Sequence, residues 1–404
     1  MEIITVDEVY RWYHQIGYIG DGIISIVSII SFIKYNNRFP KFVNFCYITL
    51  VLLVFLASIN DISIVVKKPS LLYSPKGVGT WINIGILYFA GNEKYRVKVF
   101  KVFLYICYFF IGVNLIQIYS LGSVENRNEA LYAIRDTTIN LIWIYPYYFF
   151  QENKNGSSVE IIKKYIIILL LALFAFTIAS RSYLAIVTIF VCIKIKHDLK
   201  NQSNSILIYF SLSIILGCIY YFLISSSFYN SFESFAQIFI NRVDEDSRSD
   251  QLEEFFSQYD VTSIITGEGP LITWNWSGYK DGPYQWLDNQ FILIMWWFGL
   301  PTCIIYFCFI VKALFKKIPI NNGEADKGKY ILFFWVLACA GFAIYVTISS
   351  TLYYYFISLI IGGIYVNNKS FNINIIRDAL LTENRLTKYE QIKCSINEKA
   401  TLDT

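Results

Sequence analysis

The chain has 404 residues, of which 55% are hydrophobic and only 16% are charged, and its mean hydropathy is +0.46. So little charge excludes a soluble globular protein of this length. The net charge of +4 is small, and the sequence has neither a basic tract nor a zinc-ligand spacing that would indicate nucleic-acid binding. The composition therefore predicts an integral membrane protein, whose aromatic residues, 18% of the chain, suit the membrane–water boundary.

Eleven apolar runs are candidates for membrane-spanning helices, each of which needs roughly 20 apolar residues. They cover residues 18–33, 42–58, 77–90, 99–119, 138–150, 165–180, 183–195, 206–224, 289–311, 330–347 and 351–366. The run 77–90 is weak and the run 138–150 is short. We expect an all-α polytopic membrane protein with about 11 (10–12) spans. Residues 1–366 would form a single membrane domain, and residues 367–404 a cytoplasmic tail with a short amphipathic helix over residues 375–381.

Basic clusters between the runs predict the orientation. They are Lys34, Arg38 and Lys41; Lys94, Arg96 and Lys98; Lys154, Lys163 and Lys164; Lys194, Lys196 and Lys200; and Lys312, Lys316, Lys317, Lys327 and Lys329. All five clusters fall on one side if the N-terminus is outside, and the positive-inside rule assigns that side to the cytoplasm. Lys67 and Lys68 conflict with this scheme, which leaves the number of spans near residues 59–98 open by one or two.

The N-terminal end and the cysteines add two expectations. Glu2, Asp7 and Glu8 make the N-terminus acidic, without the basic lead of a cleavable signal peptide. Seven of the eight cysteines lie in apolar runs, and the eighth is Cys394 in the tail. We interpret them as small apolar fillers rather than as disulfide partners.

Residues 225–287 form a long polar segment between two apolar runs. The segment holds ten acidic residues and three basic ones, Arg242, Arg248 and Lys280. The orientation above puts it outside the cytoplasm, where positive charge is not retained. It is the one part of the chain large enough to build a hydrophilic active site, so we expect a large helical extracytoplasmic loop.

Within this loop the spacing of Leu252, Phe255, Phe256 and Tyr259 predicts a helix with one apolar side, lying over the membrane helices as a lid. Residues 267–270, Gly-Glu-Gly-Pro, predict a tight turn that includes Gly267, Glu268 and Gly269. The aromatic residues that follow are Trp274, Trp276, Tyr279, Tyr284 and Trp286. Their rings either anchor the loop at the membrane interface or offer stacking faces to sugars.

Arg181 stands between two apolar runs with almost no loop around it. A charge placed deeper there would cost about 2.5 kcal/mol or more. It either snorkels to the surface or faces an anion. Arg127 and Arg135 lie in another predicted outer loop, residues 120–137, together with three acidic residues. These mixed charges either cover a solvated helix face or contribute to an anion site.

Asp288 and Asn289 stand where the loop ends and the next apolar run begins. An acid at a helix N-cap is an ordinary structural feature. Alternatively, a carboxylate that is partly desolvated at the boundary acquires a raised pKa and can act as a general base.

These features, in this order, resemble the family of bacterial O-antigen ligases and Wzy-type O-antigen or capsule polymerases. In that family a Ser-Arg tip joins two helices, as residues 180–182 do here. A large outer loop follows one helix later, with an arginine and a downstream Gly-x-Gly, here Arg248 and residues 267–269. A His-Asn-type motif then opens the next helix, with a glycine eleven residues later, here Asp288-Asn289 and Gly299. The resemblance covers residues 161–306.

Two departures separate this chain from the family pattern. The family's histidine position is Asp288, and the two histidines of the chain, His14 and His197, lie far from the loop in sequence. This favours a polymerase over a ligase. The spacing from Arg248 to Gly267 is looser than usual, which leaves the choice between Arg248 and Arg242 open.

The resemblance implies a glycosyltransferase of the bacterial plasma membrane that acts on its extracytoplasmic side. Donor and acceptor would be oligosaccharides on undecaprenyl pyrophosphate, with membrane lipids and a chain-length regulator protein as further partners. Arg181 and Arg248 would hold the pyrophosphate, because arginine offers a planar fork of donors. Asp288 would act as the base. We expect an inverting reaction with no cofactor and no metal, since the acidic residues lack metal-site spacing.

Secondary binding residues and rival functions complete the prediction. Substrate contacts are expected from Arg242, Arg127, Arg135, Asn289, Glu268, Gly267, Gly269, Trp274 and Trp276. The alternatives are an O-antigen ligase that transfers the glycan to lipid A–core, and a lipid-linked oligosaccharide flippase or other transporter. Transporters favour short loops and internal repeats, and the sequence has one long loop and no internal repeat.

Overall fold

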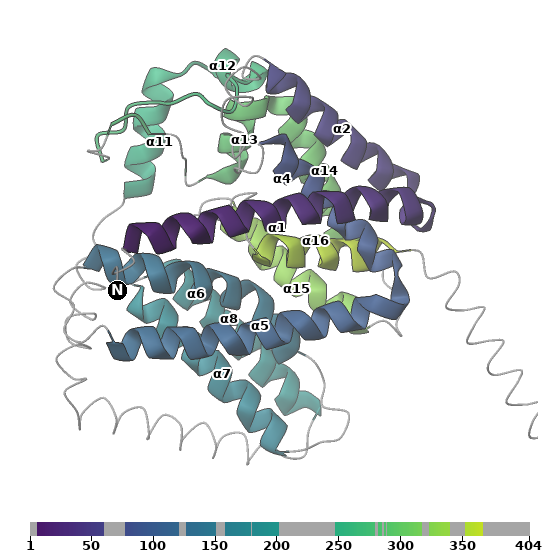
Figure 1. Cartoon of the computed structure of the whole chain (residues 1–404), viewed down its shortest axis with the longest axis vertical. Coiled ribbons are helices and arrows are strands. Elements are labelled where there is room, and N and C mark those ends of the chain that lie inside the picture. The colour runs from purple at the N-terminus through teal and green to yellow at the C-terminus, as the bar shows by residue number, and fades with distance from the viewer. Residues whose placement is uncertain are drawn as a thin grey trace, which may run out of the picture.

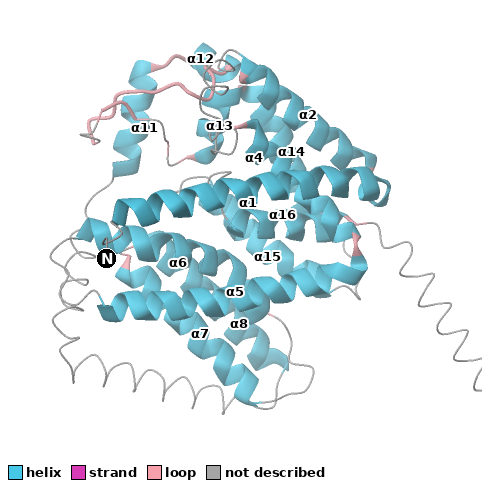
Figure 2. Ribbon diagram, in the orientation of Figure 1, coloured by secondary structure: helices cyan, strands magenta, loops and turns pink. Residues whose placement is uncertain are grey.

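The computed structural model describes residues 6–59, 77–120, 127–150, 158–178, 180–201, 247–278, 282–284, 287, 289–316, 323–339 and 352–366. This part of the chain is mostly helical and holds no strand, only one isolated antiparallel bridge between Trp274 and Tyr284 (Figures 1 and 2). The predicted all-α class is confirmed for these residues. Arg242, Asp288, the run 206–224 and the tail 367–404 lie outside them.

The helices follow the predicted apolar runs. In chain order they are α1 (Val6–Tyr35), η1 (Asn36–Arg38), α2 (Lys41–Ala57), α4 (Val78–Asn83), η4 (Ile84–Gly91), α5 (Glu93–Ser120), α6 (Arg127–Phe149), α7 (Ser158–Thr177), α8 (Arg181–Asn201), α11 (Ser247–Gln258), α12 (Val261–Thr266), α13 (Gln290–Phe298), α14 (Leu300–Phe315), α15 (Gly323–Leu337) and α16 (Leu352–Tyr365). Every predicted run that the structure describes is helical over all or part of its length.

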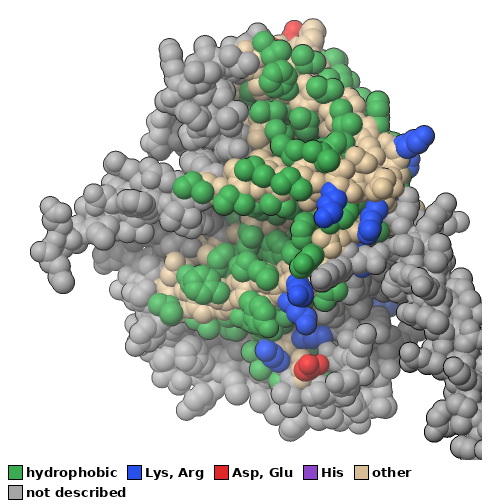
Figure 3. Space-filling model, turned by 45° about the vertical axis from the view of Figure 1, so that its right-hand side comes forward, with side chains coloured by type: hydrophobic (Ala, Val, Ile, Leu, Met, Phe, Trp, Pro, Cys, Tyr) green, Lys and Arg blue, Asp and Glu red, His purple; other side chains and the backbone are tan. Residues whose placement is uncertain are grey.

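Two helical segments in the described ranges are long and apolar enough to cross a membrane, Ile19–Arg38 and Tyr95–Ile118. Both carry exposed apolar side chains, among them Ile23 and Ile30 on α1 and Tyr105 and Ile116 on α5. Figure 3 shows a broad hydrophobic surface with lysine and arginine side chains gathered along one border. This pattern supports a location in a membrane. The full number of spans stays a prediction.

The helix ends that carry basic clusters meet at one end of the bundle. Arg38, just after α1, donates to the carbonyl oxygen of Gly91 at 2.6 Å, immediately before α5 begins. The ammonium of Lys312 near the end of α14 lies 3.7 Å from the ring centroid of Phe42 at the start of α2. Three of the five basic clusters therefore lie at one end: the one that follows α1, the one in the first turns of α5 and the one that begins at the end of α14.

The run 77–90 is not the regular α-helix that we expected. A short α-helix, α4, changes after Asn83 into the 3₁₀ helix η4, which packs between α1 and α16. A Cβ atom at Gly362 of α16 would collide with the carbonyl oxygen of Leu87, so the two backbones touch directly. The tighter 3₁₀ winding fits a segment enclosed by neighbours on several sides. Hydropathy alone contains no information about such an enclosure.

Candidate functional site

The described part of the predicted loop begins with α11, and an extended segment runs along this helix. Glu254 accepts hydrogen bonds from the backbone N–H of Ser277 at 2.9 Å and from its hydroxyl at 2.7 Å. Gln258 donates to the carbonyl oxygen of Asn275 at 2.6 Å and accepts from its N–H at 3.1 Å. Tyr259 donates to the carbonyl oxygen of Thr273 at 2.9 Å. Three side chains thus form hydrogen bonds with backbone N–H and C=O groups of residues 273–277, as a neighbouring strand would.

The segment then turns back, and residues 274 and 284 pair. The N–H of Trp274 donates to the carbonyl oxygen of Tyr284 at 2.8 Å, and the reverse bond measures 2.7 Å. We call the described residues 273–278 and 282–284 the hairpin; its aromatic side chains, Trp274, Trp276 and Tyr284, were noted in the sequence. The pairing itself was not predicted, because a single bridge leaves no alternating pattern.

Aromatic rings fill the space beneath this hairpin. Phe255, Trp274 and Trp296 are almost completely buried. Their rings contact edge to face, with 5.4 Å between the centroids of Phe255 and Trp274 and 5.2 Å between those of Phe255 and Trp296. Because Trp296 belongs to α13, this small core ties the loop to the following apolar helix. Burial of three such rings is a large hydrophobic contribution.

The predicted apolar face of α11 is correct in part. Phe255 is buried and Leu252 and Tyr259 are partly buried, but Phe256 remains 47% exposed. Gln251 is buried in its place. The buried face is therefore turned by about one residue from the expected one, because the aromatic partners on α13 and the hairpin determine which side is covered.

Trp276 and Tyr284 form the more solvent-accessible part of the same aromatic group. Their ring centroids are 4.9 Å apart, and the ring of Trp276 stacks on that of Trp274 at 6.4 Å. Both residues are only partly buried, whereas Trp274 is enclosed. Of the two predicted tryptophans, Trp276 therefore keeps accessible ring surface for stacking, and Trp274 belongs to the packing beneath it.

The loop of Gly267, Glu268 and Gly269 closes the end of α13. The N–H of Glu268 donates to the carbonyl oxygen of Trp296 at 2.7 Å, and the N–H of Gly269 donates to that of Trp297 at 3.1 Å. The last carbonyls of a helix have no partner within the helix. The Gly-x-Gly backbone supplies partners from a distant part of the chain, while the Glu268 side chain is exposed.

Gly299 interrupts the predicted run 289–311. Its φ of +82° ends α13, and α14 starts at the next residue, so the single span that we expected is two helices. A Cβ at Gly267 would lie 2.5 Å from the Gly299 nitrogen, and a Cβ at Gly299 would lie 2.9 Å from the carbonyl oxygen of Thr266. The two glycines therefore allow the backbones to touch. The two glycines belong to successive motifs of the sequence pattern, and this contact is a physical reason for glycine at both positions.

Asn289 caps the other end of α13. Its side-chain oxygen accepts from the N–H groups of Phe291 at 3.1 Å and Ile292 at 3.2 Å. The N-cap is thus Asn289 rather than its neighbour Asp288. The cap at Asn289 and the Trp296 carbonyl that Glu268 contacts are seven residues apart, or about 10 Å along the helix axis. Asn289 and Glu268 therefore lie at opposite ends of α13.

Two titratable groups in the loop have shifted pKa values. Burial, together with the negative charge of Glu268, raises the pKa of Tyr259. Hydrogen bonds from Ser263 lower the pKa of Asp260, which caps α12 by accepting from the Ser263 N–H at 2.7 Å. Both shifts follow from the local fold, which favours the neutral phenol of Tyr259 and the ionised carboxylate of Asp260.

The predicted arginines occupy helix starts. Arg181 is the first residue of α8, Arg127 the first of α6 and Arg248 the second of α11, and Arg135 lies farther along α6. In Figure 1, α11 extends from the hairpin and α12 toward the level of α1 and α6, and the turn with Arg248 is the end on that side. Helix N-termini carry partial positive charge, which suits anions. The side chains of Arg181, Arg248 and Arg127 lie outside what the structure describes.

A second polar group, which the sequence reading missed, lies among the apolar helices. Asn83 at the α4–η4 junction accepts from the Ser25 hydroxyl at 2.6 Å and donates to the Tyr355 hydroxyl at 3.1 Å. Tyr355 in turn donates to the carboxylate of Asp21. Asp21, Ser25 and Asn83 are buried. An acid within an apolar run is expensive and commonly functional, and Asp21 in the run 18–33 was the available signal.

No family model matches this chain, and comparisons with curated proteins and with solved structures find no match either. Among the residues that the structure describes, no group of three or more His, Cys, Asp or Glu side chains could hold a metal ion. The arrangement of the loop on α13 is therefore the main structural guide to function.

Proposed function

We propose that the protein is a polysaccharide polymerase of the O-antigen or capsule type. It would join oligosaccharide repeat units carried on undecaprenyl pyrophosphate, at the outer face of a bacterial plasma membrane that the chain crosses about 11 times. The single observation that carries the proposal is the contact between the Gly-x-Gly loop and the Gly299 break. Two glycines 32 residues apart, which belong to successive motifs of the family pattern, meet in space through their backbones.

The chemistry needs cations for the leaving pyrophosphate and a base for the attacking hydroxyl. Arg181 and Arg248, each at a helix start, are the proposed cations, with Arg242 as the alternative to Arg248. Fixed guanidinium groups stabilise the negative charge that develops on the leaving oxygen. Asp288, next to the cap of α13, is the proposed base, and displacement at one face would invert the anomeric centre.

The partly exposed rings of Trp276 and Tyr284 are the proposed contact for the sugar units. They stand on a hairpin whose backbone is held by α11, the helix that also carries Arg248. A sugar stacked on these rings and a pyrophosphate held at the start of α11 would then be positioned by one rigid element. Such shared support orients the reacting groups and lowers the entropic cost of reaction.

The test is reconstitution of the purified protein in liposomes with lipid-pyrophosphate-linked repeat units. The wild type is expected to make a ladder of chain lengths, whereas a ligase would make none without lipid A–core. Arg181→Ala and Arg248→Ala are expected to leave single units, and Asp288→Asn to lower the rate at least 100-fold. Arg96→Ala, at the expected inner end, is the matched control and keeps the ladder. Ladders of wild-type length from all three site variants would remove these roles.

A transporter of lipid-linked oligosaccharides remains the second candidate, and one observation favours it. Asp21, Asn83 and Tyr355 form a buried polar group at a point where an α-helix changes into a 3₁₀ helix. Interrupted helices with intramembrane acids are typical of transporters. Asp21→Asn distinguishes the two functions: it would abolish movement of a fluorescent lipid-linked oligosaccharide across liposomes, but would leave a polymerase's ladder intact.

A further inference from the structure

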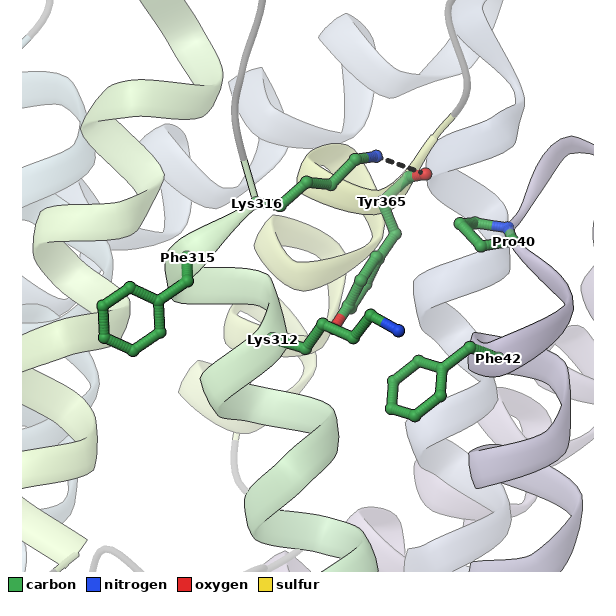
Figure 4. Close-up of a pocket in the computed structure, with 6 residues that line it drawn as sticks. All are labelled: Pro40, Phe42, Lys312, Phe315, Lys316 and Tyr365. Atoms are coloured by element: carbon green, nitrogen blue, oxygen red, sulfur yellow. Dashed lines mark hydrogen bonds between the residues drawn. The ribbon is translucent and has the colours of Figure 1, made fainter.

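A cavity opens at the end of the bundle where the basic clusters meet. It encloses about 300 Å³ and is lined by Pro40, Phe42, Lys312, Phe315, Lys316 and Tyr365 (Figure 4). The lining combines two cationic groups with three aromatic rings and a proline. This cavity lies at the far end of α14 from Gly299, about 24 Å away along the 16 residues of that helix.

The two lysines differ in what they already bind. Lys316 donates to the carbonyl oxygens of Ile364 at 2.8 Å and Tyr365 at 2.9 Å, so it caps the end of α16. Lys312 is exposed, and its ammonium lies over the ring of Phe42. In Figure 4 the Lys312 side chain extends between Tyr365 and Phe42, into the cavity. Lys312 is therefore the cation that a ligand can reach without breaking a helix cap.

Among the side chains that the structure describes, no acid pairs with Lys312 or Lys316. Lys329 donates to the backbone oxygen of Lys316, which brings a third ammonium close. Burial, reinforced by the neighbouring charge of Lys329, lowers the pKa of Lys316. An anion placed between Lys312 and Lys316 would relieve this repulsion. The positive charges around the cavity therefore make the binding of a negative group electrostatically favourable.

The apolar part of the lining indicates the rest of the ligand. Phe42 and Tyr365 cover the interior, whereas Phe315, 81% exposed, points away from them on the other side of α14 (Figure 4). The exposed apolar faces of α1 and α5 support a membrane around the bundle, and basic pockets at the cytoplasmic boundary of membrane helices bind anionic lipid headgroups. A free phosphate would leave the rings of Phe42 and Tyr365 without an apolar contact, whereas a phospholipid also supplies an acyl chain.

We propose that this cavity binds the phosphate headgroup of an anionic phospholipid of the cytoplasmic leaflet, with Lys312 as the principal contact. The inference rests on the membrane orientation given under the proposed function, but not on the polymerase activity. Phosphatidylglycerol fits the site, since it offers one negative phosphate and no competing cation. Phosphatidylcholine carries its own positive group and would meet two ammonium groups.

The test measures lipid binding by native mass spectrometry of the detergent-purified full chain. The wild type is expected to retain phosphatidylglycerol at least tenfold more tightly than phosphatidylcholine, and 10 mM inorganic phosphate should not displace it. Lys312→Gln should remove this preference, Lys312→Arg should keep it, and Lys196→Gln on α8 is the matched control for loss of one exposed lysine. Equal retention of both lipids by the wild type, or an unchanged preference in Lys312→Gln, would overturn the proposal.

Two further results are informative. Displacement by phosphate would identify a site for the free anion and would also refute the lipid assignment. If Lys312→Gln fails to fold, the preference of the wild type between the two lipids still decides the question. Because the readout is binding and not chain growth, a protein that makes no polymer but retains phosphatidylglycerol would refute the proposed function alone.

Discussion

The loop segment of residues 247–298 and the helical core around Asn83 satisfy polar groups in opposite ways. In the loop, side chains such as Glu254 and Gln258 bind the backbone of the hairpin, and the Gly-x-Gly backbone binds the carbonyls of α13. In the core, Asn83, Ser25 and Tyr355 bind mainly one another. Irregular backbone needs partners, whereas helical backbone is already satisfied and leaves polar side chains to pair among themselves.

This difference indicates which substitutions should destabilise each region. The hydrogen bonds of the loop depend on the position of its backbone, so a substitution that shifts the backbone should disrupt them. The core depends on individual side-chain atoms, and double-mutant cycles in membrane proteins give about 0.6 kcal/mol per interhelical hydrogen bond, with a maximum near 1.7. Backbone substitutions in the loop should therefore cost more than the loss of one hydroxyl in the core.

The largest effect is expected for Gly299→Ala. The new Cβ would lie 2.9 Å from the carbonyl oxygen of Thr266 at a φ of +82°, so strain and collision add. We expect a loss of about 3 kcal/mol or more in the free energy of unfolding. Gly282→Ala is the control, because its φ of +113° is also positive but the space around it is open. In detergent, the unfolding temperature should fall further for Gly299→Ala than for Gly282→Ala. Equal decreases would mean that the contact between Gly299 and Thr266 does not contribute to stability.

A smaller effect is expected for Tyr355→Phe in the core. The change removes the hydroxyl that joins Asn83 to Asp21 but keeps the ring. We expect a loss of about 1–2 kcal/mol in the free energy of unfolding, since the buried carboxylate of Asp21 loses a hydrogen-bond donor. Tyr105→Phe on the exposed face of α5 is the control and should leave the unfolding temperature unchanged. A Tyr355→Phe protein as stable as the wild type would show that the polar group does not hold the helices together.

Glu254→Gln should have a still smaller effect, confined to the hairpin. The carboxylate accepts from both the N–H and the hydroxyl of Ser277, and an amide can accept with only one of its two polar ends. We expect the stability of the hairpin to fall by about 0.5–1.5 kcal/mol. Hydrogen exchange at residues 273–277 should accelerate, and exchange in α16 should not. Glu253→Gln, on the exposed side of the same helix, is the matched control.

The smallest effect concerns pH. The lowered pKa of Asp260 means that the folded loop favours the carboxylate, so its contribution is present above the ordinary aspartate pKa and is lost as pH falls through the folded value. Hydrogen exchange of α12 should therefore increase modestly on acidification below about pH 4. Asp260→Asn, which keeps a cap acceptor, should remove this pH dependence. Persistence of the dependence in that variant would assign it to another group.

The sequence predicted the helical class because apolar runs and basic clusters are local signals. It could not predict the break at Gly299 or the 3₁₀ winding after Asn83, because both depend on what packs against the chain. The core pair Asp21–Tyr355 is separated by 334 residues, and no local pattern joins them. The Asn289 cap was missed for a similar reason, since Asp288 and Asn289 are equally good capping residues on sequence grounds.

In the candidate site, the glycine pattern was informative because Gly267 and Gly299 are each required by a backbone contact. The aromatic residues were informative about location but not about role: Trp274 is packed beneath the hairpin and Trp276 is partly accessible. The roles of Arg181, Arg248 and Asp288 stay predictions.

The capping of α13 by residues 268 and 269 also has a consequence for biogenesis. During synthesis the Gly-x-Gly loop emerges before α13 does, since the Trp296 and Trp297 carbonyls that it binds come later in the chain. In the proposed orientation this loop is translocated, and it cannot complete its fold until α13 has followed it. Arrest of translation between residues 269 and 296 should leave this loop sensitive to protease added from outside, and arrest after α14 should protect it.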